Sequence, residues 1–445
     1  MSNKAKSKFY LTLVIFSLVG QIAWVIENMY FNVFIYKMFN ASASDISLMV
    51  GASAVAATLT TVFMGALSDK VGKRKIFMSA GYILWGISIL LFAFIRKDFI
   101  SSVFAGVANA ATVGVSLVII MDCIMTFFGS TANDACFNAW LTDCTNDGDR
   151  GKAEGINSMM PLIAILAVFG GFMGFDLDKA NSWSVIYIII GVAVSLIGVL
   201  GFFIIDEPAN IKSDELGYFK TIVYGFKPSV IKSNQGLYVS LIAFMVFGIS
   251  IQIFMPYLII YYEKTLDIAN YVIIMAPAII LASVATALYG RLYDKFGFKN
   301  TVLPSLVCLL LGCFILYLFP QVINVRGAGM KTIVFFGSLF MMTGYLTGMA
   351  VFGAKIRERT PESMAGRFQG LRIIGQVLLP GVIGPFIGAA VLKNADKIQG
   401  SDGTESFLPN ANIFIAAAFV VALLIAGIVL YFALKGKNVA KESKE

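Results

Sequence analysis

The sequence contains no histidine, and only 13% of its 445 residues are charged. Without histidine, a Ser-His-Asp triad and the histidine clusters of catalytic metal sites are excluded. The five cysteines lack metal-site spacing and lie in or beside apolar runs, so neither a disulfide framework nor a metal site is expected. A soluble domain carries roughly 25% charged residues. We therefore expect no enzyme, no cofactor and no soluble globular fold.

Apolar residues take the place of the missing charge, at 58% of the chain with a mean hydropathy of +0.82. They form long uncharged runs, of which 76–95 and 183–205 are examples. At ~1.5 Å per residue, a run of about twenty residues spans the ~30 Å of membrane hydrocarbon as a helix. The sequence therefore predicts an all-α protein that crosses the lipid bilayer many times.

About twelve such helices are expected along the chain. The first follows three lysines, but it is too long for a secretory signal and has no small-residue cleavage site, so we expect it to be retained. The expected helices are 9–36, 46–67, 76–95, 112–141, 155–175, 183–205, 237–262, 270–290, 301–320, 332–354, 370–392 and 411–434.

The basic residues indicate the orientation of these helices. Of the 34 lysines and arginines, 25 fall at the two termini or in loops on the same side as the termini. The positive-inside rule then predicts a multi-pass protein of the cell membrane with both termini in the cytoplasm. The net charge of +8 is scattered over short loops, so no nucleic-acid partner is expected.

A repeat divides the chain into halves. The segments 65–75 (GALSDKVGKRK) and 290–300 (GRLYDKFGFKN) match at five positions with an offset of 225 residues. Each follows the second helix of a six-helix half. The repeat predicts an N-terminal bundle at 1–205, a polar cytoplasmic linker at 206–236 and a C-terminal bundle at 237–445.

The first copy resembles the G-x-L-x-D-[KR]-x-G-[RK]-[RK] loop of the major facilitator superfamily. This resemblance implies two six-helix pseudo-repeats and a transporter, expected as a monomer, that moves a small molecule by alternating access. The alternative interpretation is a cationic topology signal, which does not explain why an acid and two glycines recur. The resemblance implies a conformational latch formed by Gly65, Asp69, Gly72, Arg74, Asp294 and Gly297.

Two acids lie well inside the expected spans, Glu27 in helix one and Asp122 in helix four. An ionisable group in hydrocarbon costs several kcal/mol and normally faces a cavity or a partner. No lysine or arginine is expected within the membrane to neutralise these acids. Because the chain has no histidine relay, we expect Glu27 and Asp122 to couple transport to a proton or another cation, with Glu27 the better placed.

Helix four also carries a polar stripe. Asp122, Thr126, Asn133 and Trp140 fall near one line at ~100° per residue. The segment 133–140, leading to 147–150, resembles the helix-four passage of glycoside-pentoside-hexuronide:cation symporters, and 28–36 resembles the aromatic helix one of that family. The sequence departs from the family by lacking a proline after the acid and carboxylates in helix two, so sodium coupling is not favoured.

The second resemblance implies that Asp134 binds sugar hydroxyls with Trp140 near the inner end of the site. The other polar residues of the spans are expected to contact the solute, or alternatively to bond helices together at about 1 kcal/mol each. The expected substrate-binding residues are Asp134, Asn133, Asn138, Trp140, Asn28, Gln252 and Gln376.

Other functions remain open on sequence grounds. A drug or metabolite exporter would share the loop, and 19 methionines with 38 phenylalanines could line an apolar cavity. A non-transporting membrane sensor usually carries a sizeable soluble domain, whereas the longest expected loop here has about thirty residues.

Overall fold

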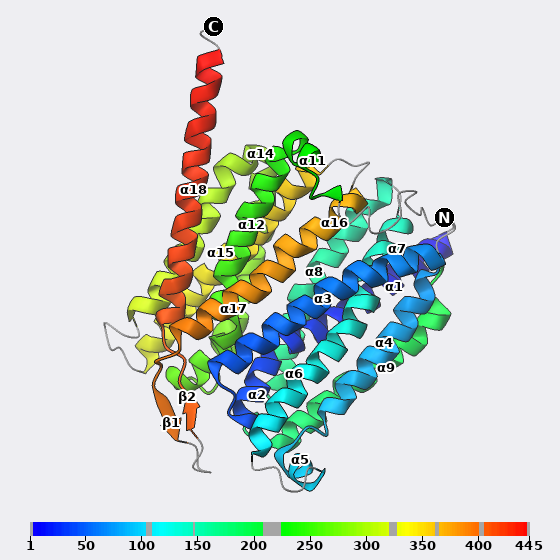
Figure 1. The fold of residues 1–445 in the computed structure, drawn as a ribbon, viewed down its shortest axis with the longest axis vertical. Helices are drawn as coiled ribbons and strands as arrows, with labels where there is room; N and C mark the ends of the chain where they lie inside the picture. Colours follow the sequence, from blue (N-terminus) through cyan, green and yellow to red (C-terminus); the bar gives the residue numbers. More distant parts are fainter. Residues whose placement is uncertain are drawn as a thin grey trace. The chain divides into compact units, whose positions relative to one another are not determined.

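The computed structural model describes residues 3–103, 109–145, 147–207, 224–319, 327–360, 365–399 and 405–442. The chain divides into two compact units, each a bundle of helices (Figure 1). Unit 1 comprises Met1–Ile222 and Lys397–Phe407, and unit 2 comprises Val223–Asp396 and Leu408–Glu445. Residues 208–223, most of the linker expected at 206–236, lie outside the described residues.

Unit 1 is built from helices that follow one another along the chain. Two of its spans contain a π-helical segment, labelled η1 and η2. The elements are α1 (Asn3–Val25), η1 (Ile26–Tyr30), α2 (Phe31–Phe39), α3 (Ala43–Val71), α4 (Arg74–Phe92), α5 (Lys97–Val103), α6 (Ala110–Gly129), η2 (Ser130–Phe137), α7 (Asn138–Asp143), α8 (Asp147–Phe172) and α9 (Ala180–Ile204).

Unit 2 has the same character. Its elements are α11 (Pro228–Ser233), α12 (Gln235–Phe254), the 3-10 turn η3 (Met255–Tyr257), α13 (Leu258–Ile260), the π-helical η4 (Tyr261–Thr265), α14 (Val272–Leu318), α15 (Ala328–Arg359), α16 (Ala365–Ile373), the π-helical η7 (Ile374–Leu378), α17 (Leu379–Val391) and α18 (Asn412–Glu442).

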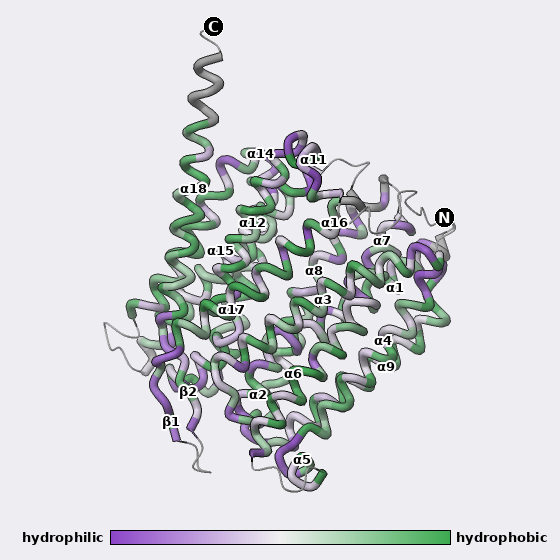
Figure 2. Tube along the Cα trace, in the orientation of Figure 1, coloured by the Kyte–Doolittle hydropathy of each residue, from purple (hydrophilic) through white to green (hydrophobic). Residues whose placement is uncertain are grey.

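The expected helix count is confirmed. Eleven helices among the described residues are long and apolar enough to cross a membrane. One of them, α14, contains Gly297 at φ 70° and ψ 177°, a non-helical conformation that divides it into two spans. Hydrophobic residues run along the helices and hydrophilic ones gather towards their ends (Figure 2). Large apolar side chains such as Phe203 (74% exposed) also point outward, as contact with lipid requires.

The ends of α3 illustrate how local sequence sets the boundaries. The Ser42 hydroxyl accepts a hydrogen bond from the Asp45 backbone N–H at 3.2 Å, and the Asp45 carboxylate accepts one from the Ser42 backbone N–H at 2.8 Å. Such a reciprocal cap contributes about 1 kcal/mol. The helix ends at Gly72, whose φ of 69° is a left-handed conformation that a side chain would disfavour.

An aromatic cluster fills the core of unit 1 where α2, α4 and α9 meet. Phe34 lies 5.3 Å from Trp183 and 5.2 Å from Tyr187, measured between ring centroids. Phe31 lies 4.5 Å from Phe92 and 5.6 Å from Tyr187. All five rings are buried, so the cluster holds the end of α2 against two neighbouring helices.

A short hairpin, not expected from the sequence, belongs to unit 1. Its strands β1 (Lys397–Gln399) and β2 (Glu405–Phe407) pair antiparallel, with Ile398 opposite Ser406. The hydroxyl of Tyr36 on α2 donates to the Phe407 carbonyl at 2.7 Å. The Ser406 hydroxyl donates to the Asn40 side-chain oxygen at 3.0 Å. These bonds attach the hairpin to the end of α2.

Close packing of α4 on α9 depends on glycine. A Cβ added at Gly191 would lie 2.6 Å from Leu90 Cγ and 2.8 Å from the Gly86 carbonyl oxygen.

Gly191→Ala should therefore force the helices apart and destabilise the protein by about 1–3 kcal/mol, seen as a lower Tm in detergent. Gly170→Ala on α8 is the control, because nothing lies within 4 Å of the added carbon. Equal melting temperatures for both variants would contradict this packing.

Candidate functional site

Five of the nine residues expected to bind solute or couple an ion lie on π-helical segments. Four such segments occur within the part of the chain that the structure describes. A π turn interrupts the regular i to i−4 hydrogen bonding and is frequent at functional sites. Glu27 and Asn28 lie on η1, Asn133 and Asp134 on η2, and Gln376 on η7.

Glu27 lies at the centre of a buried polar cluster. Its side chain is 6% exposed, and its Oε1 accepts hydrogen bonds from the hydroxyls of Ser53 on α3 and Thr126 on α6, both at 2.8 Å. The two hydroxyl oxygens lie 2.9 Å apart. Oε2 is buried without a hydrogen-bond partner. Three helical segments thus meet at one carboxyl oxygen.

Asp122 is the second acid of this cluster. It is 1% exposed, its side chain contacts the Ser53 hydroxyl, and its Oδ1 is buried without a partner. Among the described residues no lysine or arginine forms an ion pair with Asp122 or with Glu27. The structure therefore brings two buried acids together without a compensating cation among the described residues.

Asp134 lies eight residues, about two helical turns, beyond Thr126 and is only partly buried. Its Oδ2 accepts a hydrogen bond from the Ser130 hydroxyl at 2.9 Å. The exposed Asn138 donates from Nδ2 to the Asp134 backbone carbonyl at 3.0 Å. A carboxylate oxygen and an exposed amide are thus available near each other to a polar ligand.

Asn133 has a different environment. It is 3% exposed, its Nδ2 donates to the Tyr82 hydroxyl at 2.7 Å, and its Oδ1 accepts from Trp24 Nε1 at 3.2 Å. Tyr82 in turn donates to the Phe16 carbonyl at 2.6 Å. This chain of bonds links α1, α4 and η2, so both ends of the Asn133 amide are engaged inside the bundle.

Trp140 is also engaged by the protein. Its side chain is 1% exposed, and Nε1 donates to the Asp206 carbonyl at 3.0 Å. Its rings lie 5.2 Å from Phe9 and 6.0 Å from Phe137, measured between centroids. The predicted polar stripe of helix four thus faces the interior of unit 1, and the indole is enclosed by neighbours.

The remaining expected ligands are more accessible. Asn28 is exposed and donates from Nδ2 to the Trp24 carbonyl at 2.8 Å. In unit 2, Gln252 on α12 and Gln376 on η7 are partly buried. A Cβ added at Gly384 would lie 2.4 Å from Gln252 Cβ, so Gln252 lies where α12 touches α17.

The first loop copy forms an ionic cluster around Arg74, which is 3% exposed. Its guanidinium forms a short ion pair with Asp69, donates to the Ser68 hydroxyl, and pairs through Nε with Asp143 Oδ2 at 3.0 Å. The turn at Gly72 brings Arg74 back over the end of α3, while the space beside Gly65 is nearly open. Asp143, at the end of α7, was not anticipated as a member.

The second copy repeats a glycine at positive φ but not the ionic cluster. Gly297 has φ 70° and Gly72 has φ 69°, at the same offset of 225 residues, whereas their ψ values are 177° and 28°. Asp294 is exposed, and no described side chain forms an ion pair with it. Lys299 occupies the position of Arg74 and lies over the Phe432 ring at 5.9 Å. The halves therefore share a glycine at positive φ but differ in its ψ angle and in charge pairing.

Sequence reasoning missed Ser53 and Tyr82. Ser53 is a single small hydroxyl in the apolar helix α3, and Tyr82 is one of 17 tyrosines. Neither belongs to a motif, and nothing in the sequence marks the π-helical turns that carry the acids. Thr126, the other hydrogen-bond partner of Glu27, could be anticipated from the sequence, because it lies on the predicted polar stripe with Asp122.

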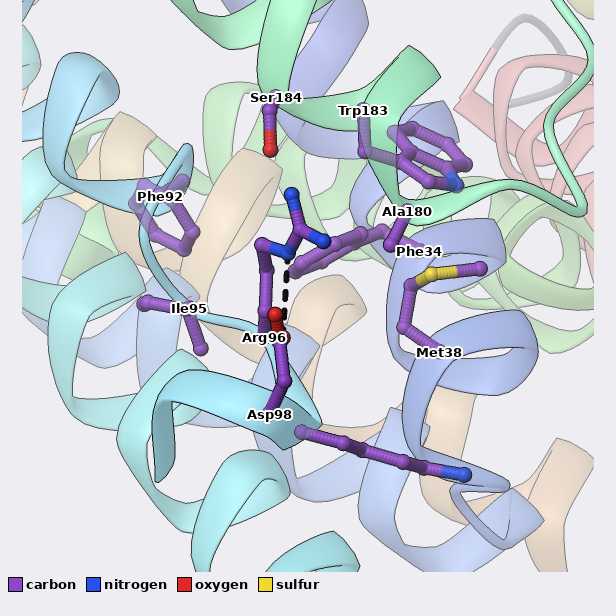
Figure 3. Close-up of a pocket in the computed structure, with 10 residues that line it drawn as sticks. Phe34, Met38, Phe92, Ile95, Arg96, Asp98, Ala180, Trp183 and Ser184 are labelled. Atoms are coloured by element: carbon purple, nitrogen blue, oxygen red, sulfur yellow. Dashed lines mark hydrogen bonds and ion pairs between the residues drawn. The ribbon is translucent and has the colours of Figure 1, made fainter. Parts of the chain in front are cut away.

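A cavity of about 250 Å³ lies apart from these residues, between the ends of α2, α4 and α9 (Figure 3). Arg96 crosses it, pairing through Nε with Asp98 at 3.1 Å and donating from Nη1 to Asn181 at 2.8 Å. Slight desolvation acts to raise the pKa of Asp98, but the hydrogen bond and charge of Arg96 outweigh it and lower that pKa. None of the expected site residues lines this cavity.

Solved structures of transporters share the fold of this chain. The nucleoside transporter NupG has a TM-score of 0.69 at 13% identity, covering 95% of this chain and 98% of its own. The xylose transporter XylE from E. coli has a TM-score of 0.68 at 13% identity, covering 94% and 96%. A bacterial homolog of the human lysosomal transporter Spinster has a TM-score of 0.66 at 15% identity, covering 97% of each.

A comparison with curated protein sequences finds no match. The model of the Major Facilitator Superfamily matches residues 11–385, which is most of the chain and includes both loop copies. With eleven apolar helices among the described residues, one of them divided at Gly297, and with a glycine at positive φ in both loop copies, this multi-pass membrane protein belongs to the Major Facilitator Superfamily.

Proposed function

We propose that the protein is a secondary active transporter that moves a small polar solute, a sugar or glycoside, together with a proton. The observation that carries this proposal is the pair of buried acids, Glu27 and Asp122, without a cation in a family of transporters. Two structural relatives support the solute class, since one is a nucleoside transporter and another a D-xylose-proton symporter. The distribution of basic residues among the loops supports a location in the cell membrane with both termini in the cytoplasm.

The acids are suited to carry the coupling proton. Burying an unpaired ionised carboxylate costs several kcal/mol, and two such charges side by side also repel each other. A proton bound to the pair removes much of this cost. Binding or releasing a proton would therefore change the free energy of this buried cluster by more than it would change that of a carboxyl group exposed to water.

The spacing of the oxygens favours a proton over a metal ion. Glu27 Oε1, Ser53 Oγ and Thr126 Oγ1 lie 2.8–2.9 Å from one another. These separations are hydrogen-bond distances, so the three oxygens are placed to share protons with one another. The arrangement supports proton symport as the coupling mode.

Solute binding is assigned to the accessible polar groups. Asp134 can accept hydroxyl hydrogens in charge-assisted bonds, and Asn28 and Asn138 offer exposed amides. We assign Asn133 and Trp140 a supporting position, because their polar atoms bond to the bundle itself. In unit 2, Gln252 and Gln376 are the side chains proposed to contact the solute.

Uptake into proteoliposomes tests the coupling. With a proton gradient, the wild type should accumulate a radiolabelled sugar from a panel of pentoses, hexoses and glycosides against its gradient. Glu27→Gln should abolish this accumulation while sparing downhill exchange, since the amide cannot carry the proton. Asp176→Asn, an exposed acid outside the spans, is the control. Accumulation that depends on sodium instead would refute proton coupling.

Asp134→Asn tests the solute contact. Losing a charge-assisted hydrogen bond costs about 1.5–3 kcal/mol, so the Kd of the transported solute should rise by roughly ten- to a hundredfold. Equilibrium binding to the purified protein measures this change without any transport step. Asp98→Asn should leave the Kd unchanged, because Asp98 is exposed and pairs with Arg96. An unaltered Kd for Asp134→Asn would remove this residue from the site.

Asp69→Asn tests the proposed latch at the first loop. Asp69 and Asp143 both neutralise the buried Arg74, so losing one charge should weaken the access state in which this cluster forms. The initial rate of uptake should fall by roughly tenfold, matching a charged hydrogen bond of about 1.5–3 kcal/mol. Lys70→Gln, which changes an exposed charge of the same loop, should not slow uptake. A normal rate for Asp69→Asn, at equal insertion, would leave the loop only a topological role.

A further inference from the structure

Three oxygen atoms form a closed triangle in the interior of unit 1. Glu27 Oε1 lies 2.8 Å from Ser53 Oγ and 2.8 Å from Thr126 Oγ1, and the two hydroxyl oxygens lie 2.9 Å apart. Each side of the triangle is a hydrogen-bond distance for oxygen atoms. The three groups come from η1, α3 and α6, so the triangle joins three spans.

A count of protons shows what this geometry requires. Each hydrogen bond needs one proton, a hydroxyl supplies one, and an ionised carboxylate supplies none. Ser53 and Thr126 together provide two protons for three contacts. If Glu27 were ionised, one side of the triangle would set two lone pairs against each other at a buried position, which is strongly unfavourable.

A proton on Glu27 Oε1 completes the triangle. Glu27 then donates to one hydroxyl, that hydroxyl donates to the other, and the second donates back to Oε1. Every oxygen donates once and accepts once, an arrangement in which the bonds polarise and strengthen one another. The triangle is therefore fully hydrogen-bonded only when Glu27 is protonated.

The surroundings do not offer another way to satisfy an ionised Glu27. The ionisable groups that act on it are Asp122 and Cys123 on α6 and Asp134 on η2, and none of them is cationic. Asp122, one of these acids, also lies beside Ser53. Glu27 Oε2 and Asp122 Oδ1 remain buried without partners.

We propose that Ser53 and Thr126 are positioning residues that hold the coupling proton on Glu27 in a closed ring of three hydrogen bonds. This inference rests on the proposed proton symport and adds α3 to the proton site. When the proton leaves Oε1 for water, both hydroxyls must turn to the carboxylate. The direct bond between Ser53 and Thr126 is then lost, and with it one bond between α3 and α6.

Infrared spectroscopy of the protein in liposomes, without solute, tests the ring. The carbonyl stretch of a protonated carboxyl should be present in the wild type near neutral pH, and Glu27→Gln should remove one component. Ser53→Ala and Thr126→Val should shift this component to higher frequency, because a hydrogen bond to the carboxyl is lost. Each should also displace the pH at which the component disappears.

Two further variants separate a positioning role from a merely structural one. Ser53→Thr keeps the hydroxyl and should restore the wild-type band and pH profile. Thr58→Val removes another buried hydroxyl of α3, one that bonds only to the Ala54 carbonyl, and should change neither. If Ser53→Ala does not fold, Thr126→Val, which keeps the side-chain shape, makes the same measurement.

Two outcomes would overturn the ring. One is a spectrum in which Glu27→Gln removes no protonated carboxyl, and the other is a band that Ser53→Ala and Thr126→Val leave in place. Failure of proton symport has a different signature, since uptake would then be independent of the proton gradient while the band still responded to these variants. The band and the uptake assay therefore test separate statements.

Discussion

The absence of water from the membrane interior is the constraint on which the structure depends. Every backbone N–H and C=O in hydrocarbon needs a partner within the protein, and helices meet this need segment by segment. Side chains are under the same demand. Asn133 bonds to Tyr82 and Trp24, and Arg74 bonds to two acids and Ser68. Nine buried side-chain polar atoms of the described residues have no hydrogen-bond partner, and the two that belong to carboxyl groups are those of Glu27 and Asp122.

Departures from regular helix geometry concentrate where these polar groups lie. The π-helical η1 and η2 carry Glu27 and Asp134, while the packing of α4 on α9 beside them uses glycines that allow close contact. A tightly packed α4 and α9 form a stable frame, against which the less regular segments present the acids. The cluster thus combines Glu27 on a π turn with Asp122, Ser53 and Thr126 on regular α-helices.

The hydropathy pattern and the internal sequence repeat alone predicted most of the fold. The all-helical membrane fold and its apolar spans come from local patterns, because a span is defined by its own composition. The hairpin at Lys397–Phe407 was missed, since its strands are three residues long and carry no alternating pattern. The acids were found because charge is rare in a span, whereas Ser53 was not, because serine is common there.

By itself, the sequence determined the membrane fold, the family and the small set of acids that could carry function, since these depend on residue type and on spacing along the chain. Only the tertiary structure decided that Ser53 and Thr126, 26 and 99 positions from Glu27, would meet at one of its oxygens. It also decided that Trp140 would be enclosed by Phe9 and that Arg74 would reach Asp143. Such contacts join different helices, and their geometry depends on helix packing and π turns that no local pattern encodes.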